Sequence, residues 1–423
     1  MLSVCIITKN EEHNIARCLK SFQKTGFELI VADTGSTDQT KKAAAEYTDH
    51  IYDFPWCDDF SAAKNFAISK ATALIHPLHS VVLSWDSLLD FFISVMVIIN
   101  SWMIQTIYTN RYGKNSLFNM VIMFINMGLL LFISNMIGYN WQQWYYHTCW
   151  AVGTLTLTLF FQYLVEFFRE STDNANRESI KGFLWLTGLQ SLGVYLAALF
   201  PIYVGVYIFI ASILLTFIVP IFLITKDEHF QVNLPHLIER VSLLVIITFG
   251  EMVINLVSFF TAESFSIYSV LNFIIMLSLF LFYFGEFDHA IDENSNQKGL
   301  FQIYSHYPIF IGLMLITVAM GFLLNPEANL LASISFFYIG IGLFQAAVLA
   351  NGPYNKHYLS YSKSYYCIQA TLYLVALILA LVASNPTIVL SVATIFTLAI
   401  ASHFIYFYVT QNKKYSKSNW GIF

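Results

Sequence analysis

One apolar segment of this sequence carries ionisable side chains at helical spacing. We expect residues 241–260 to span a membrane, with Glu251 near the middle. An ionisable group at that depth is costly, so it is by default a functional-site hypothesis. At about 100° per residue, His236, Arg240, Glu251 and Asn255 return to nearly the same helix face. Together with Glu239, which adjoins Arg240, they form a predicted intramembrane polar stripe.

Two interpretations of this stripe stay open. It could be a pathway for protons or ions, or a contact for the carboxylate of a small-molecule substrate. Alternatively, Glu251 is protonated and hydrogen-bonded to a neighbouring helix, and serves packing only.

A second acidic run follows the apolar stretch 267–286. Carboxylates beside a histidine could bind a divalent cation, but such a run is more often a solvated helix end. We therefore predict neither a metal nor a cofactor. The run consists of Glu286, Asp288, His289, Asp292 and Glu293.

Other polar positions favour structural roles. Glu166 and Arg169, with Glu170 next to them, indicate an interfacial ion pair. We expect His306 and Pro308 to cap and kink the start of a helix. The five cysteines have no zinc or redox spacing.

The elements that position these residues are apolar stretches of membrane-spanning length. Apolar residues make up 57% of the chain and charged residues 11%. We expect eleven spans, at 88–107, 117–137, 148–168, 180–200, 203–224, 241–260, 267–286, 305–325, 328–350, 366–384 and 387–408. The lipid bilayer is the expected partner. Nothing in the chain indicates nucleic-acid binding, and the oligomeric state stays open.

Basic residues predict the orientation of these spans. The thirteen Lys and Arg residues beyond position 80 all fall in alternate connections or in the tail. Basic loops stay in the cytoplasm, so we expect a multi-pass protein of the plasma membrane with a cytoplasmic C-terminus.

The first 58 residues have the pattern of a soluble α/β protein and not of a membrane-spanning region. Strands are expected at 3–8, 27–31 and 50–52, and helices at 11–22 and 40–47. The second strand runs into Asp33, and a Gly-Ser turn precedes the next helix. Carboxylates and backbone amides at this edge of an α/β sheet are typical of nucleotide sites.

These residues resemble family-two glycosyltransferases of the GT-A fold. The similar pieces are SVCIITKNEE (3–12), FELIVADTGSTDQT (27–40) and FSAAKNFAISKAT (60–72). The resemblance implies nucleotide contacts at Thr8, Asn10, Glu11, Asp33 and Asp38, and places Lys64 and Asn65 in a family helix.

The resemblance is incomplete. The family's next strand ends in Asp-x-Asp, which holds a metal on the sugar diphosphate, but here Asp86 and Asp90 stand four apart at the start of an apolar helix. The acceptor half is also absent. A transferase needs a cation to stabilise its leaving group, so enzymatic activity is not favoured.

The remainder resembles the low temperature requirement A (LtrA) membrane protein family. The similar pieces are AISKATALIHPLHSVVLSWDSLLDFF (67–92), LPHLIERVSLLVIITFGEMVINL (234–256) and SHYPIFIGLMLITVA (305–319). The resemblance implies a bacterial membrane protein, with growth in the cold suggested by the family's name.

We therefore expect an incomplete α/β segment at 1–65 and an all-α polytopic bundle of 11–12 transmembrane helices at 66–423. Residues 60–82 would form the twelfth span, although Lys64 and Lys70 make its insertion costly. Otherwise residues 1–60 would be exported, because eleven spans and a cytoplasmic C-terminus place the N-terminus outside. The favoured function is a transport-like or stress-related membrane role organised around Glu251. The alternatives are a membrane-attached glycosyltransferase that uses a nucleotide-sugar, and a fusion of two genes without function.

Overall fold

A computed structural model describes most of the chain. The described residues are 3–22, 28–53, 85–114, 116–137, 141–169, 174–226, 230, 232–257, 259–261, 264–293, 298–325, 328–383 and 385–420. Lys64, Asn65 and the expected span 60–82 lie outside them. The chain divides into two compact units, residues 1–94 with 127–151 and residues 95–126 with 152–423.

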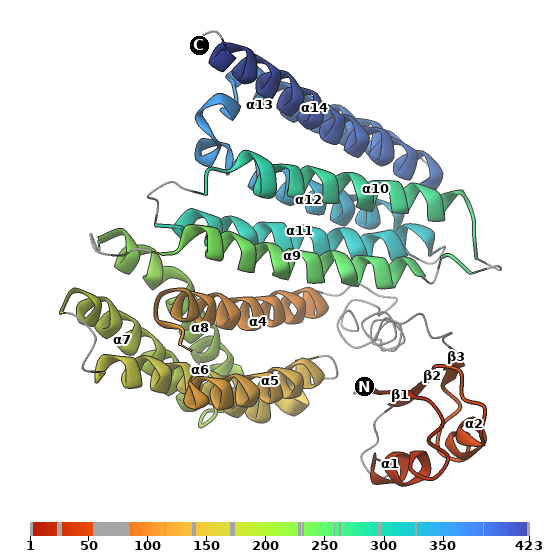
Figure 1. Ribbon diagram of the computed structural model, residues 1–423, viewed down its shortest axis with the longest axis vertical. Helices are drawn as coiled ribbons and strands as arrows, with labels where there is room; N and C mark the ends of the chain where they lie inside the picture. The colour runs from red at the N-terminus through yellow and green to blue at the C-terminus, as the bar shows by residue number, and fades with distance from the viewer. Residues whose placement is uncertain are drawn as a thin grey trace. The chain divides into compact units, whose positions relative to one another are not determined.

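The N-terminal part of the first unit is a small α/β segment (Figure 1). Its strands β1 (Ser3–Thr8), β2 (Glu28–Asp33) and β3 (Ile51–Asp53) are parallel, with β2 in the centre. Helices α1 (Ile15–Phe22) and α2 (Thr40–Ala44) connect them. Each predicted strand and helix of this segment is present. The alternation follows from apolar strands that must be covered by amphipathic helices.

A small apolar core holds this segment together. Its buried members are Ile15 and Leu19 of α1, Leu29 and Val31 of β2, and Ala44 of α2. The spacing of Ile15 and Leu19 by four residues places both on the same face of α1, which is the arrangement that buries one side of a helix.

The chain beyond Trp85 is helical. Among the described residues it forms eleven long helices, one for each predicted span. They are α4 (Trp85–Tyr112), α5 (Leu117–Ile137), α6 (Trp141–Phe167), α7 (Asn174–Ala197), α8 (Ile202–Lys226), α9 (Leu234–Val257), α10 (Ile267–Phe284), α11 (Leu300–Leu324), α12 (Leu330–Leu349), α13 (Lys363–Val382) and α14 (Pro386–Trp420). Asp86 and Asp90 belong to α4, so they do not end a strand.

Nine of these helices are long and apolar enough to cross a membrane, as counted over the described residues. The two others are α7 and α9. The fold is therefore an all-α polytopic membrane bundle preceded by a small α/β segment, as the sequence predicts. Large apolar side chains remain exposed along α8 and α13, as expected for helices whose outer surface contacts lipid rather than water.

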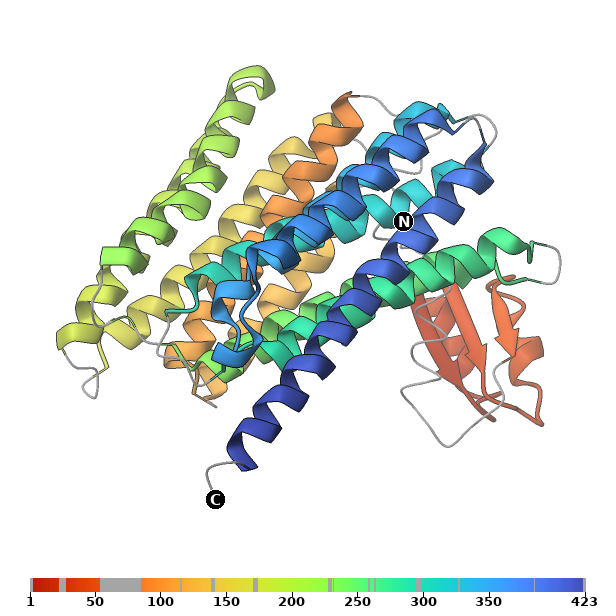
Figure 2. The same cartoon turned by 90° about the horizontal axis from the view of Figure 1, so that it is seen from above.

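Within the second unit, α11 is the central helix. It packs against both α9 and α12. A Cβ atom added to Gly312 of α11 would lie 2.6 Å from the backbone oxygen of Gly340 in α12, and one added to Gly340 would lie 2.8 Å from the oxygen of Gly312. Two glycines face each other here because helices in lipid associate closely through small residues. Helix α14 runs alongside α10 (Figure 2).

Candidate functional site

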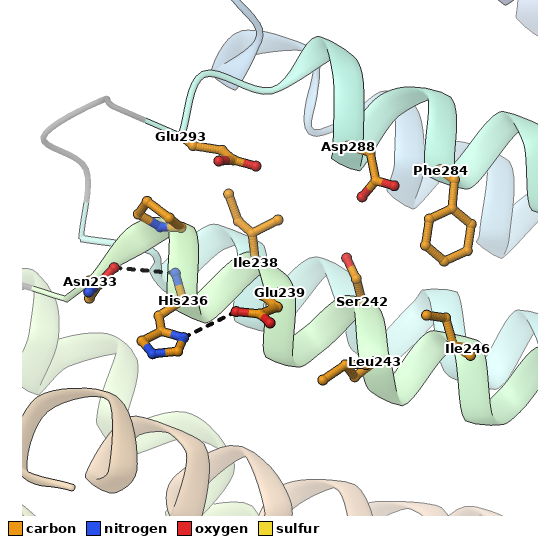
Figure 3. Close-up of a pocket in the computed structure, with 11 residues that line it drawn as sticks. Asn233, His236, Ile238, Glu239, Ser242, Leu243, Ile246, Phe284, Asp288 and Glu293 are labelled. Atoms are coloured by element: carbon orange, nitrogen blue, oxygen red, sulfur yellow. Dashed lines mark hydrogen bonds and ion pairs between the residues drawn. The ribbon is translucent and has the colours of Figure 1, made fainter. Parts of the chain in front are cut away.

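A pocket opens where α9 begins. Its volume is about 570 Å³, and both α9 and the end of α10 contribute to its wall (Figure 3). Ser242 of α9 and Asp288, which follows α10, point into the space between the two elements. The lining residues are Asn233, Pro235, His236, Ile238, Glu239, Ser242, Leu243, Ile246, Phe284, Asp288 and Glu293.

The pocket combines an acidic end with an apolar wall. Three carboxylates line it, from Glu239, Asp288 and Glu293, whereas His236 is the only cation-forming side chain among the described lining residues. Nδ1 of His236 lies 3.2 Å from the carboxylate of Glu239, and both side chains are exposed. Surplus negative charge in a cleft raises the local concentration of cations, so the pocket is suited to protons or cationic solutes.

A buried hydrogen-bonded series leads inward from Ser242. Its Oγ lies 3.4 Å from the hydroxyl of Tyr283, and that hydroxyl lies 2.7 Å from Nε2 of His306. Nδ1 of His306 contacts the carbonyl oxygen of Gln302, which can only accept. The proton of the neutral ring must therefore be on Nδ1, so Nε2 accepts from Tyr283 and Tyr283 accepts from Ser242.

This series corrects one expectation and includes two residues that the sequence analysis missed. We expected His306 to cap a helix, but this is wrong: the N-cap of α11 is Gly299, and His306 is completely buried about two turns further on. Ser242 and Tyr283 were not singled out from the sequence. The available signal was spacing, since Ser242 follows Glu239 by three residues and Tyr283 precedes Glu286 by three, which places each pair on one helix face.

The predicted polar stripe on α9 is divided in the structure. His236 and Glu239 line the pocket, but Arg240, Glu251 and Asn255 do not. Because α9 ends at Val257, Glu251 lies in the last third of the helix and not near its middle. The helix begins earlier than the predicted span, at Leu234, so residues 235–240 already have helical backbone.

Glu251 itself is half-buried. Among the described residues no hydrogen bond or ion pair reaches its carboxylate, in contrast to the packing interpretation. One turn further along, Nδ2 of Asn255 donates to the carbonyl oxygen of Thr317 in α11, at 2.8 Å. Asn255 therefore attaches α9 to α11.

The acidic run after α10 is not a solvated helix end throughout. Gly285–Ala290 form a π-helical turn, and Glu286 within it is completely buried. A π-turn adds a residue to the helix and thus rotates the following side chains. In the part of the chain that the structure describes, no group of three or more His, Cys, Asp and Glu residues could hold a metal ion.

The ion pair expected at the end of α6 is confirmed. Nη1 of Arg169 lies 2.5 Å from Oε2 of Glu166, and Nζ of Lys114 lies 3.9 Å from Oε1. Glu170 lies outside the described residues.

At the N-terminus, the residues implied as nucleotide contacts meet at one edge of the sheet. Thr8 and Asp33 are paired in register at the strand ends. Asp33 accepts from the backbone N–H groups of Gly35 and Ser36, at 3.2 and 2.9 Å. The hydroxyl oxygen of Thr8 is buried without a hydrogen-bond partner.

The neighbouring loop residues bond to each other. Oδ1 of Asn10 accepts from the backbone N–H of Thr37 at 2.8 Å, and the N–H of Glu11 donates to Oγ1 of Thr40 at 2.7 Å. Asn10 adopts a positive φ of 54° in this loop. The two loops after β1 and β2 are thus held together by side chains that the resemblance assigns to a nucleotide.

Asp38 takes part in the same loop contact. Its carboxylate accepts from the hydroxyl and the backbone N–H of Thr40, and from the N–H of Glu12. Partial desolvation raises the pKa of Asp38, but the bonds from Thr40 and Glu12 together lower it by more, so this pKa lies below its usual value.

Comparison with known proteins identifies the class. Residues 65–412 match the family of the bacterial low temperature requirement A protein (LtrA). The match covers most of the chain and includes α4 to α13, together with most of α14. The chain therefore belongs to the LtrA family and is a multi-pass membrane protein.

The N-terminal segment has a different relationship. Residues 3–75 match glycosyl transferase family 2. The chain is also 45% identical over 71 residues to a TPR repeat-containing protein of Synechococcus elongatus. That similarity covers 17% of this chain and 18% of the relative. No solved structure matches the chain.

Proposed function

We propose that the helical region is a transporter for protons or small ions, in which Glu251 takes part in the passage. The observation that carries this proposal is the half-buried carboxylate of Glu251 on α9, which has neither a hydrogen bond nor an ion pair among the described residues. Helix α9 packs against α10 and α11, and both are candidate membrane spans. A carboxylate left unpaired in such surroundings is costly unless it binds a proton or a cation.

The pocket and the buried series support the same proposal. The pocket presents three carboxylates at the start of α9. Ser242 in its wall begins the series through Tyr283 to His306, in which the Ser242 hydroxyl donates to Tyr283 and the Tyr283 hydroxyl donates to His306. Such an arrangement can pass a proton by successive transfers. Growth at low temperature, which the family's name implies, would then depend on ion balance.

We further propose that the protein lies in the plasma membrane with its C-terminus in the cytoplasm. The basic residues after α4, α6, α8, α10 and α12, and those of the tail, support this orientation. They are Arg111, Lys114, Arg169, Arg177, Lys181, Lys226, Arg240, Lys298, Lys356, Lys363, Lys413, Lys414 and Lys417. Tags placed after Gly138 and after Phe260 would then both report the exterior. An interior signal from both would contradict the orientation.

We also propose that the functional division of the chain lies near residue 65, with the α/β segment at 1–65 acting as an accessory to the helical region at 66–423. A complete transferase is not supported, because Asp86 and Asp90 are in helix α4. In addition, the side chains of Asn10 and Asp38 already bond to neighbouring loops.

The test is flux through the purified full-length protein in liposomes. A pH-sensitive dye inside the vesicles reports proton entry driven by a pH gradient, and sodium and potassium salts are compared as co-ions. Glu251→Gln keeps the shape and removes the charge, so its flux should fall to that of empty liposomes. Glu178→Gln is the matched control, because Glu178 is exposed and paired with Lys181.

Two outcomes would refute the proposal. One is wild-type flux no greater than that of empty liposomes. The other is wild-type flux that Glu251→Gln leaves unchanged.

A further inference from the structure

A bridge of side chains joins the last three helices of the chain. It consists of Gln345 of α12, Gln369 of α13 and His403 of α14. Nε2 of Gln345 donates to Oε1 of Gln369 at 2.9 Å, and Nε2 of Gln369 lies 3.1 Å from Nδ1 of His403. Both glutamines are buried, whereas His403 is half-buried. Two consecutive hydrogen bonds therefore hold α12, α13 and α14 together.

A backbone group fixes the direction of each bond in this bridge. Nε2 of Gln345 also donates to the backbone carbonyl oxygen of Gln369, at 3.3 Å. Because a carbonyl oxygen can only accept, this end of the Gln345 amide is its NH₂ group. The atom of Gln369 that faces it is then the amide oxygen, so the NH₂ group of Gln369 faces His403. Nδ1 of His403 therefore accepts, and the ring is neutral with its proton on Nε2.

Stacking also holds the His403 ring. The ring lies on that of Tyr365, with centroids 4.5 Å apart and planes 17° from parallel. Tyr365 stacks in turn on Tyr361, at 4.2 Å, and the hydroxyl of Tyr361 donates to Glu286 in the π-helical turn. The hydroxyl of Tyr365 accepts from Nε2 of Gln369 at 3.3 Å. Both N–H bonds of the Gln369 amide are thus used, one by Tyr365 and one by His403.

No charged side chain among the described residues forms an ion pair with His403. Helix α14 packs chiefly against α10, α13, the π-helical turn and the 3₁₀ turn His357–Leu359. Of their titratable side chains, Tyr365 lies on the His403 ring, and Glu286 lies beyond the two stacked tyrosines. The others have partners elsewhere or are exposed, and they are Tyr268, Tyr283, Asp288, His289, His357, Tyr358, Lys363, Tyr366, Cys367 and Tyr373. The bond to Gln369 is therefore the polar contact that distinguishes the neutral from the charged ring.

Protonation of His403 is incompatible with this bond. The added proton binds Nδ1, so two N–H groups then face each other at 3.1 Å. The Gln369 amide cannot turn its oxygen toward the ring, because its NH₂ group would then face the NH₂ group of Gln345. A charged ring gains some attraction to the face of Tyr365, but the lost hydrogen bond and the two unsatisfied donors outweigh it.

We propose that His403 is a pH-sensitive switch that releases α14 from the α12–α13 pair when its ring is protonated. The ring lies about 26 Å along α14 from Pro386, close to the edge of a hydrocarbon layer about 30 Å thick. Because it is half-exposed there, a proton reaches it from the adjoining water. The bridge is closed while the ring is neutral and opens in acid. This switch does not depend on the passage of ions at Glu251.

Thermal unfolding of the full-length protein in lipid nanodiscs tests the switch. It is measured at about pH 7.5 and at about pH 5.5, on either side of the ordinary titration of histidine. The wild type should lose several degrees more in acid than His403→Asn, because the asparagine oxygen accepts from Gln369 as Nδ1 does but does not titrate. The other histidines, including the buried His306, are present in both proteins, so the difference between them reports His403 alone. His357→Asn is the matched control, since His357 is exposed and its substitution should leave the wild-type loss unchanged.

Gln369→Glu provides a second test with the opposite sign. A carboxylate at this position accepts from Gln345, from the hydroxyl of Tyr365 and from a charged His403, so the protonated ring becomes the bonded form. This variant should therefore lose less in acid than the wild type.

Three results would overturn the switch. One is an equal loss in acid for the wild type and His403→Asn. Another is a loss in Gln369→Glu as large as that of the wild type. The third needs no folded variant of Gln369: a ¹⁵N spectrum of histidine-labelled protein at about pH 7.5 that shows the proton of His403 on Nδ1, since the bridge requires this nitrogen to accept. None of these measurements records flux, so their failure is distinguishable from failure of the proposed transport.

Discussion

The hydroxyl of Tyr283 lies 2.7 Å from Nε2 of His306, and both side chains are completely buried. This bond joins α10 to α11 across the interior of the second unit. It also fixes the tautomer of the histidine, because the other ring nitrogen contacts a carbonyl oxygen.

Tyr283→Phe should therefore destabilise the protein, because Nε2 of His306 is left buried and unpaired. The expected cost is about 1–3 kcal/mol of unfolding free energy. Thermal unfolding in detergent measures it. Tyr406→Phe is the matched control, since Tyr406 is exposed and its substitution should change the unfolding temperature little. Equal stability of Tyr283→Phe and wild type would mean that the bond contributes nothing.

The contact between α11 and α12 predicts an asymmetry between two glycines of one helix. Gly312→Ala would place a methyl group against the backbone of Gly340, whereas nothing lies within 4 Å of a Cβ at Gly321. The first substitution should cost about 1–3 kcal/mol through overpacking. The second should be neutral or slightly stabilising, since alanine favours helix over glycine. Yield of folded protein by fluorescence size-exclusion chromatography distinguishes the two, and similar losses in both would contradict this packing.

Substitution of Glu166 should lower the free energy of unfolding more than substitution of the exposed residue Glu178. Glu166 is buried at the end of α6 and paired with Arg169, which is partly exposed. Glu166→Ala leaves Arg169 without this partner, and we expect a loss of about 1–3 kcal/mol. Glu178→Ala breaks an exposed pair with Lys181 and should cost less than about 1 kcal/mol. Urea unfolding followed by tryptophan fluorescence compares the two, and equal losses would be the contrary result.

The loops of the N-terminal α/β segment should become less stable, and easier to cleave by a protease, at acidic pH. The pKa of Asp38 is below its usual value of 3.8 in the folded protein. Its bonds thus stabilise the loops above the unfolded pKa, and this stabilisation is lost as the pH falls through the lower folded pKa. Proteolysis of the full chain by pepsin between pH 2 and 5 measures the change at residues 9–40. Asp38→Asn should remove this component of the pH dependence, and an identical pH profile in both proteins would exclude the role of Asp38.

Much of the fold could be predicted, because the pattern of apolar and polar residues within each segment determines its secondary structure and whether it contacts lipid or water. Stretches of apolar residues had to form helices, and the predicted span 117–137 coincides with α5. Likewise, alternation of strand and helix in residues 3–53 required a parallel sheet.

The candidate site was harder to predict, because it depends on contacts between distant segments. The sequence singled out Glu251 and His236 by their position in an apolar pattern. It could not show that Tyr283 meets His306, or that Tyr361, between α12 and α13, donates to Glu286. The π-helical turn was also hidden, since it rotates Glu286 inward by a local change of hydrogen bonding that no spacing rule at 100° per residue detects.

Helix α14 has one more consequence. Its 35 residues extend for about 52 Å, whereas the hydrocarbon layer of a bilayer is about 30 Å thick. The segment around Lys413 therefore extends beyond the hydrocarbon layer, and the ring of Tyr415 there stacks on Tyr358. A fluorescent reporter joined beyond Trp420 would be held away from the lipid headgroups, which makes this end a natural handle for imaging or immobilising the protein.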